Sequence, residues 1–297
     1  AREVQANLAA ARNLHIVDLP IIEIRTSGDR IQDRPLSEVG GKGLFTMEIE
    51  EALYAGTIDV AVHSLKDLET DMPPGLEIAA VLEREDVRDA LISLKYAALS
   101  ELPKGARVGT SSLRRRAQLR HFRPDIEVVE FRGNVQTRLK KLGDGVADAT
   151  FLACAGLKRL DRSDQITAAL PVTEMLPAVG QGAIAVQMRS GEPDRAAAVA
   201  ALDHKPTHKC VVTERAFLRE LDGSCRTPIA GLAEIKGDEI TFCGEILAVD
   251  GSRKFATALT CGSDVSEERA SAAARDLLIQ AGPDFFDPDN SDKADTP

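Results

Sequence analysis

Arginine side chains gather beside two predicted turns in residues 109–138. The first half of this stretch begins Gly-Thr-Ser-Ser-Leu-Arg-Arg-Arg, and the second half contains Val-Val-Glu-Phe-Arg-Gly-Asn-Val-Gln-Thr-Arg-Leu. Each half has the pattern of a short β-branched strand that turns through small polar residues into a helix. The two turns would therefore lie at the carboxyl ends of strands, the edge at which open α/β sheets bind ligands.

Arg114 and Arg115 predict a bound anion. They would fall in the first turn of a helix capped by Ser111 or Ser112, where the helix dipole disfavours a cation by up to ~1 kcal/mol. A negatively charged group should compensate for this. The hydroxyls of Thr110, Ser111 and Ser112 and the free N–H groups of the helix start would add donors for it. We therefore expect a polycarboxylate or a phosphate as the ligand.

A solvated basic helix face is the alternative for these two arginines. It suits three further arginines of the same predicted helix, namely Arg116, Arg120 and Arg123. Nucleic-acid binding by this helix is disfavoured, because 37 basic and 47 acidic side chains give the chain a net charge of −10. Such a charge would repel nucleic acids and anionic membranes. We therefore expect neither of them as a partner.

The 297 residues, 43% of them hydrophobic, are enough for two or three globular domains with real cores. The sequence has no uninterrupted apolar run near the roughly 18 residues of a membrane span, and no charged-then-apolar leader. We expect a cytoplasmic protein.

Five cysteines are widely spaced and form no Cys-x-x-Cys pair, which argues against a disulfide framework or a zinc site. Cys225 stands in a predicted loop next to Arg226, where it can be exposed and its thiolate favoured. The other four are expected to be small buried hydrophobic residues: Cys154, Cys210, Cys243 and Cys261. Cys225 is therefore the candidate for a chemically special thiol, with an ordinary reduced thiol as the alternative.

The first predicted lobe begins with a helix from Ala1 and a strand over residues 16–25. Lys42 lies among three glycines at 40, 41 and 43, which suggests a mobile loop that closes over a site. An ordinary turn before a helix at residues 44–55 is the alternative. A strand at 58–62 then leads into Lys66 and Asp67, a pair that is weak evidence by itself because Lys/Asp neighbours are common on surfaces.

The second predicted lobe starts near residue 89 and ends with a strand at 149–153 and a helix at 156–160. Arg159 would be a third basic group one turn beyond a strand end, with a structural salt bridge as the alternative. The glycine-rich segment 177–183 is typical of a hinge, and the strand at 184–187 could return to the first sheet. Two crossings between two α/β lobes would make a hinged cleft, as in periplasmic binding proteins.

The third predicted domain is a small α+β unit. It comprises a helix from Lys205 to Leu221, strands at 229–235, 240–249 and 254–260 with hairpin turns between them, and a helix at 264–281. We therefore expect lobe 1 at 1–84 with 183–202, lobe 2 at 88–178, this domain at 205–282, and a disordered acidic tail at 283–297.

Seven short motifs follow one another along the chain: His-Ser-Leu-Lys-Asp at 63–67, Gly-Thr-Ser-Ser-Leu-Arg-Arg at 109–115, Phe-Arg-Gly-Asn-Val at 131–135, Thr-Arg-Leu at 137–139, Ala-Gly-Leu-Lys-Arg at 155–159, Ala-Val-Gly-Gln-Gly at 178–182 and Gly-Ser-Cys at 223–225. In order and spacing they resemble the motifs of the porphobilinogen deaminase (hydroxymethylbilane synthase) family. The resemblance covers the chain up to the acidic tail. Two departures stand out. The family's Arg-x-Ser-Pro-Leu-Ala motif would precede the helix that starts at Ala1, and Glu69 replaces a usual proline.

The resemblance implies a monomeric transferase of tetrapyrrole (haem) biosynthesis that joins four porphobilinogen molecules head to tail, with release of ammonia. It implies a dipyrromethane cofactor attached through a thioether to Cys225, and no metal. Asp67 matches the family's catalytic aspartate, and Lys66 beside it is the second residue expected to take part in catalysis. The residues implied to bind the cofactor and the growing polypyrrole chain are Lys42, Thr110, Ser111, Ser112, Arg114, Arg115, Arg132, Arg138, Arg159 and Gln181.

The implied substrate suits the predicted anion site, because porphobilinogen carries an acetate and a propionate and a chain of pyrroles is a polycarboxylate. A function of another class stays open at this point. A hinged solute-binding protein for a small polycarboxylate would also use two lobes and a basic cleft. The reactive-looking Cys225 and the third domain favour catalysis over this alternative.

Overall fold

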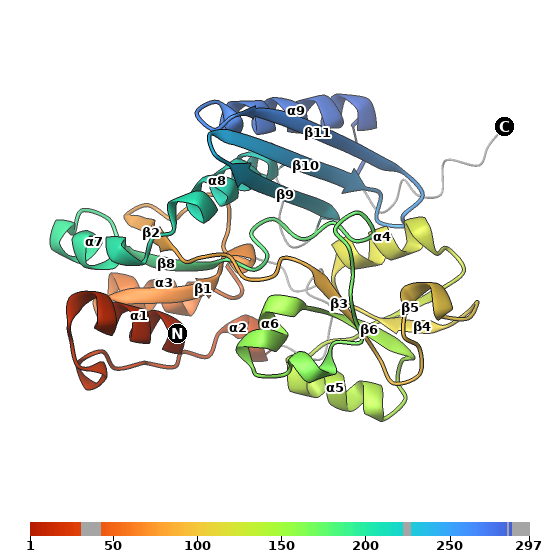
Figure 1. Ribbon diagram of the computed structural model, residues 1–297, viewed down its shortest axis with the longest axis horizontal. Helices are drawn as coiled ribbons and strands as arrows, with labels where there is room; N and C mark the ends of the chain where they lie inside the picture. The colour runs from red at the N-terminus through yellow and green to blue at the C-terminus, as the bar shows by residue number, and fades with distance from the viewer. Residues whose placement is uncertain (31–42, 222–226, 284, 287–297) are drawn as a thin grey trace. The chain divides into compact units, whose positions relative to one another are not determined.

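The computed structural model describes residues 1–30, 43–221, 227–283 and 285–286 (Figure 1). The chain divides into two compact units, Ala1–Glu85 with Ala183–Val211 and Asp86–Gly182 with Val212–Pro297. Three sheets organise the described residues, and the fold is mixed α/β. The predicted domain boundaries, which separate residues 205–282 as a third domain, stay a prediction.

The first unit is built on an antiparallel sheet with the order β1-β8-β2. Its strands are β1 (Val60–Ser64), β2 (Leu76–Val81) and β8 (Ile184–Arg189). Its helices are α1 (Arg2–Arg12), α2 (Ser27–Arg30), α3 (Met47–Tyr54) and α7 (Pro193–Val199), with 3-10 turns η1 (Ile16–Asp18), η2 (Leu65–Asp67) and η5 (Ala200–Leu202). One core cluster joins Val4 of α1 to Val186 and Val199, and another joins Leu53 of α3 to Ala61.

The strand predicted at residues 16–25 is wrong. Only the short turn η1 forms there, and Val17 and Ile22 are 82% and 56% exposed. A strand needs a neighbour to accept and donate its backbone hydrogen bonds, and no described strand pairs with this segment. The side chain of Gln5 instead donates to the carbonyl of Leu19 at 2.7 Å. Local β-propensity was therefore not sufficient to predict a strand here, because a strand forms only where a second strand pairs with it.

The second unit contains a five-stranded sheet with the order β5-β4-β6-β3-β7. Its strands are β3 (Asp89–Ser93), β4 (Arg107–Gly109), β5 (Glu127–Val129), β6 (Ala149–Ala153) and β7 (Ala168–Ala169). Its helices are α4 (Leu113–Phe122), α5 (Val135–Gly143) and α6 (Cys154–Arg159), with 3-10 turns η3 (Leu99–Glu101) and η4 (Ser163–Gln165). Strands β4, β5 and β6 are parallel, and β3 is antiparallel to β6.

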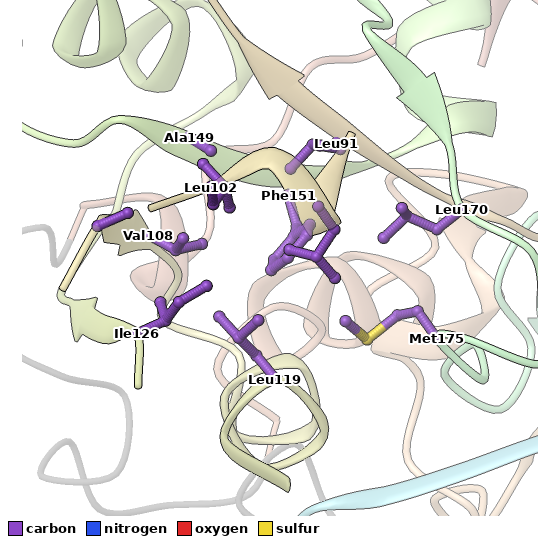
Figure 2. Packing of buried hydrophobic residues seen from close by; sticks show 11 residues of the cluster. Leu91, Leu102, Val108, Leu119, Ile126, Ala149, Phe151, Leu170 and Met175 are labelled. Carbon is purple, nitrogen blue, oxygen red and sulfur yellow. The ribbon is translucent and has the colours of Figure 1, made fainter. Parts of the chain in front are cut away.

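Helices cover both faces of this sheet. Leu119 of α4 packs on one face against Val108, Phe151 and Met175, as Figure 2 shows. Leu142 of α5 and Leu157 of α6 belong to the cluster on the other face. Successive residues of a strand point to opposite faces, so Leu91 joins the first cluster while Ala90 and Ile92 join the second.

The chain passes between the first two sheets twice. It leaves the first sheet after β2, enters the second at β3, and returns after β7 to β8. This agrees with the two predicted crossings. The segment before β8 contains Gly180 and Gly182, whose φ angles of 72° and 88° bend the backbone there.

The C-terminal part of the second unit carries a separate antiparallel sheet with the order β11-β10-β9. Its strands are β9 (Ile229–Lys236), β10 (Glu239–Leu247) and β11 (Lys254–Gly262), and α9 (Ser266–Ala281) lies along the sheet in Figure 1. Helix α8 (Lys205–Glu220) precedes this sheet, and Phe217 of α8 contacts Phe242 with ring centroids 5.0 Å apart. The predicted small domain of three antiparallel strands and helices is confirmed.

Two details of this domain differ from the sequence analysis. Cys154 and Cys210 are buried as predicted, but Cys243 is exposed and Cys261 is half-buried. Successive side chains of β10 point to opposite faces of the sheet. Ile240 and Phe242 point to the buried face, so Cys243 points to the exposed one. Phe285, in the predicted tail, is buried against Phe255 with ring centroids 5.5 Å apart, whereas residues 284 and 287–297 lie outside the described residues.

Candidate active site

The predicted basic turns meet at one edge of the five-stranded sheet. Gly109, the last residue of β4, lies opposite Val129 of β5 and Thr150 of β6. Because these three strands are parallel, the segments that follow them start from the same edge. Close packing holds two of these segments together, since a Cβ on Gly109 would lie 2.4 Å from Cγ of Phe131. This confirms that both arginine-bearing turns follow strand carboxyl ends.

Asp89 reaches the same edge from the opposite direction. It is the first residue of β3, and because β3 is antiparallel to β6 it lies opposite Ala153, the last residue of β6. The Asp89 side chain is fully buried. The topology therefore places one buried carboxylate at the edge where the arginines begin.

Arg114 and Arg115 both pair with Asp89. Nη2 of Arg115 lies 2.6 Å and Nη1 of Arg114 lies 2.8 Å from its carboxylate oxygens, and Nε2 of Gln181 donates to Oδ1 at 3.0 Å. Burial by itself would raise the pKa of Asp89, but the two guanidinium groups outweigh it and hold that pKa well below its usual range. Asp89 is therefore charged at neutral pH.

This arrangement excludes one of the two interpretations of Arg114 and Arg115. Their side chains are 6% and 7% exposed, so they are not a solvated helix face, and the negative group that compensates them is Asp89 of the protein itself. That they also bind an anionic ligand stays a prediction. Nη1 of Arg114 also donates to the carbonyl of Leu176 at 2.8 Å, and Nη1 of Arg115 donates to that of Phe151 at 3.1 Å. Asp89 was not among the residues predicted from the sequence to form the site. An acidic residue at the start of the apolar run Asp-Ala-Leu-Ile was the signal that could have found it.

Arg138 lies in a strongly positive environment. Burial, together with the charges of Arg115 and Arg132, lowers the pKa of Arg138 to about 10. Its Nε donates to the carbonyl of Gly133 at 2.8 Å, and no carboxylate among the described residues forms an ion pair with it. Guanidinium groups that repel one another at a sheet edge would be stabilised by a bound anion. This cluster of Arg115, Arg132 and Arg138 is the strongest indication of an anion site.

The three predicted hydroxyl groups also lie at this edge. Oγ of Ser112 caps α4 by accepting from the backbone N–H of Arg115 at 3.4 Å, which settles the choice between Ser111 and Ser112 as the cap. Oγ1 of Thr110 accepts from the N–H of Ser112 at 3.2 Å, and Oγ of Ser111 accepts from that of Phe131 at 3.3 Å. Each hydroxyl is the acceptor in these bonds, so its own proton can be donated to a ligand.

Arg159 and Gln181 bring the glycine-rich segment before β8 to the same edge. Nη2 of Arg159, at the end of α6, donates to the carbonyl of Gly182 at 3.1 Å. Nε2 of Gln181 donates to the carbonyl of Val87 at 2.7 Å as well as to Asp89. Gln181 thus helps to hold Asp89, the partner of Arg114 and Arg115, in place. Arg159 is exposed at the surface. Their predicted contacts with a ligand stay predictions.

Lys66 and Asp67 lie in the other unit, in η2 directly after β1, as predicted. Leu65 anchors this turn, because its side chain is buried and its N–H donates to the carbonyl of Ala183 at 3.0 Å. His63, two residues before it, is also buried. Burial lowers the pKa of His63 to about 4 despite a hydrogen bond with Gln187, so this imidazole is uncharged at neutral pH.

Two predicted residues, Lys42 and Cys225, lie outside the described residues. In the part of the chain that the structure describes, no group of three or more His, Cys, Asp or Glu side chains could hold a metal ion. No helix in the same part is long and apolar enough to span a membrane.

These features define a two-unit α/β protein with a cluster of arginines at a sheet edge. The family model described as "Porphobilinogen deaminase, dipyromethane cofactor binding domain" matches residues 1–197, and "Porphobilinogen deaminase, C-terminal domain" matches residues 208–278. This chain belongs to the porphobilinogen deaminase family.

Curated relatives agree with this assignment. A porphobilinogen deaminase from Paracoccus denitrificans is 53% identical over 97% of this chain and 92% of its own length. One from Nitrobacter hamburgensis is 50% identical over 96% of this chain and 90% of its own length. Among solved structures, a nutrient binding protein from Burkholderia cenocepacia bound to methionine is similar with a TM-score of 0.43, at 16% identity over 69% of this chain and 87% of that one.

Replacing Asp89 with asparagine should strongly destabilise the second unit. The substitution leaves two buried guanidinium groups without a counter-charge, and removing one partner of a buried ion pair costs about 3–5 kcal/mol. The free energy of unfolding, measured by urea denaturation, should fall by this order. Asp125→Asn is the matched control, because Asp125 pairs with Arg123, the residue that follows α4, where both side chains are partly exposed. Equal effects of the two substitutions would contradict the central role of Asp89.

Proposed function

We propose that this chain is a hydroxymethylbilane synthase, a transferase of haem biosynthesis that joins four porphobilinogen molecules head to tail and releases ammonia each time. Membership of the porphobilinogen deaminase family supports this function. The observation in the structure that carries it is the cluster of Arg115, Arg132 and Arg138 at one sheet edge. Acetate and propionate groups of the substrate and of the growing chain are anions that such a cluster would bind.

Arginine suits this task because its planar guanidinium can form two parallel hydrogen bonds with one carboxylate. Arg132 and Arg138 are half-buried, so they combine access to a ligand with partial exclusion of water. The hydroxyls of Thr110, Ser111 and Ser112 would donate further hydrogen bonds. Lys42, Lys66, Arg114, Arg159 and Gln181 complete the proposed binding set, with Arg114 and Gln181 acting through Asp89 as well.

The same donor set fits a dipyrromethane cofactor, because two linked pyrroles with carboxylate side chains are also a polycarboxylate. We propose that Cys225 holds this group through a thioether, since a thiolate is a soft nucleophile and a thioether resists hydrolysis. When bound, the cofactor supplies the pyrrole chain to which the first substrate is joined. The chain's own contribution is to orient carboxylates at the arginine cluster.

Asp67 is proposed to act at the reacting carbon. When the aminomethyl C–N bond of porphobilinogen breaks, ammonia leaves with the electron pair and the remaining azafulvene is a cation. A carboxylate stabilises this developing positive charge. It can also accept hydrogen bonds from the pyrrole N–H and assist the proton transfers. We further propose that the protein acts as a monomer in the cytoplasm.

Arg138→Leu should weaken substrate binding without unfolding the protein. A charge-assisted hydrogen bond is worth about 1.5–3 kcal/mol, which corresponds to a rise in KM of roughly tenfold or more. The fold should persist, because the substitution also relieves repulsion with Arg115 and Arg132. KM for porphobilinogen and the melting temperature are measured together. Lys140→Leu is the control on the same helix, where the exposed Lys140 pairs with Asp144. An unchanged KM for Arg138→Leu would exclude the cluster as the binding site.

Asp67→Asn should abolish most turnover while Asp67→Glu retains some. An amide still accepts hydrogen bonds but carries no charge, and losing a comparable electrostatic group costs roughly a hundred- to a thousandfold in rate. The variants should fold and keep the cofactor. If Asp67 forms only a structural salt bridge, Asp67→Asn would instead lower the melting temperature while turnover of the folded fraction stays near normal. Measuring kcat and melting temperature on one preparation separates the two cases.

The peptide that contains Cys225 should carry a dipyrromethane adduct. Mass spectrometry of the active protein should find the added mass there, and Cys225→Ser should lack it. Cys243→Ser is a matched control, because Cys243 is an exposed thiol of the same domain and its replacement should leave the adduct in place. An unmodified Cys225 peptide from fully active protein would rule out the thioether.

A further inference from the structure

The hairpin between β10 and β11 sits directly on helix α4. Gly251 is in this hairpin with a φ of +81°, and a Cβ added to it would lie 2.7 Å from the carbonyl oxygen of Ala117 and 2.9 Å from the backbone nitrogen of His121. Real Cβ atoms essentially never come this close to such atoms, and a helix backbone cannot rotate aside as a flexible side chain can. The absence of a side chain at residue 251 therefore sets how closely the hairpin approaches the helix.

Directed contacts fix the same junction. Nδ1 of His121 lies 3.0 Å from the carbonyl oxygen of Gly251, so that nitrogen carries the proton and donates it. Nζ of Lys254, on β11, lies 5.2 Å from the ring centroid of Phe122 and 2.6 Å from the carboxylate of Glu245. The ammonium group thus links the last residue of α4 to a buried acid of β10. These contacts orient the hairpin as well as limiting its distance.

Helix α4 connects this junction to the arginine site. Ala117 and His121 contact the hairpin, while Arg115 pairs with Asp89 near the start of the same helix. Gln118 secures the helix between them, because its side chain both donates to and accepts from the backbone of Leu176 at 2.9 and 2.8 Å. A helix of ten residues is about 15 Å long and moves as a stiff rod. A displacement at the hairpin would therefore tilt the arginines.

We propose that Gly251 is a positioning residue that sets the C-terminal domain against α4. This inference rests on the proposed function, in which Cys225 of that domain holds the cofactor and the arginines bind its carboxylates. Cys225 precedes β9 by four residues in the sequence. Because the hairpin packs directly on α4, it fixes the distance and orientation between two parts of the protein. These are the C-terminal domain, which contains Cys225, and the helix that contains Arg114 and Arg115.

The same sheet offers a matched control. Gly237 lies in the other hairpin, between β9 and β10, with a φ of +62°, and a Cβ there would meet no atom within 4 Å. At either position an alanine would have to adopt a positive φ angle, which strains any residue that has a Cβ. Only alanine at residue 251 also pushes against α4. The difference between the two variants therefore isolates the contact with the helix.

The experiment compares Gly251→Ala and Gly237→Ala in the full chain. Cofactor content is measured by intact mass, and kcat, KM and melting temperature are measured on the same preparations. Gly237→Ala should lower the melting temperature with parental kcat and cofactor content. Gly251→Ala should, in addition, reduce kcat or cofactor content at least tenfold. A Gly251→Ala protein with parental cofactor content and kcat would overturn the inference and leave the proposed function standing.

A second pair of variants tests the junction without backbone strain. His121→Ala removes the hydrogen bond to residue 251, whereas His121→Asn can place an amide donor near the position of Nδ1. We expect a several-fold lower kcat for His121→Ala and recovery in His121→Asn, a rescue that a general loss of stability would not give. If Gly251→Ala does not fold, the two His121 variants test the inference instead. A parental kcat in both His121→Ala and His121→Asn would overturn it. A parental chain that fails to convert porphobilinogen would refute the proposed function itself, and the inference with it.

Discussion

The buried contact of one carboxylate with two arginines determines the rest of the candidate site. Asp89 is fully buried, and Arg114 and Arg115 approach it to 2.8 and 2.6 Å. Removing Asp89 would leave two guanidinium groups without this counter-charge in a low-dielectric interior. The contact also fixes α4 to the sheet edge, because both arginines belong to the first turn of that helix. The position of the basic turn thus depends on a residue from an antiparallel strand.

Positive charge is concentrated at this edge. Asp89 pairs with Arg114 and Arg115, the charge of Glu245 also acts on Arg114, and Arg138 is a further cation whose pKa is lowered by burial and by Arg115 and Arg132. Neighbouring cations repel one another, so under the proposed function the carboxylates of one ligand would stabilise them. The segment before β8 supports this group through two residues: the carbonyl of Leu176 accepts from Arg114, and the side chain of Gln181 donates to Asp89.

The C-terminal domain contributes to this site through packing. Its hairpin contacts the second half of α4, and the first half of that helix carries the arginines. Its sheet also contacts the segment before β8, because the N–H of Gly231 donates to the carbonyl of Pro177 at 3.1 Å. Glu214 of α8 joins these parts, since its carboxylate accepts from the N–H groups of Gly180 and Ala233 at 2.7 and 2.8 Å. The arginine site therefore rests on elements from three regions of the sequence.

The sequence by itself determined the local elements whose signals are short in range. A helix cap at Ser111 or Ser112, the strand ends before the basic turns and the three C-terminal strands follow from neighbouring residues, and the seven ordered motifs identified the family. Only the tertiary structure decided which of these elements pair. It left residues 16–25 without a strand partner, turned Cys243 outward, and brought Asp89 to Arg114 and Arg115. The physical reason is that pairing and burial of charge depend on residues distant in the chain, here 26 positions apart for Asp89 and Arg115, and local propensity contains no information about that distance.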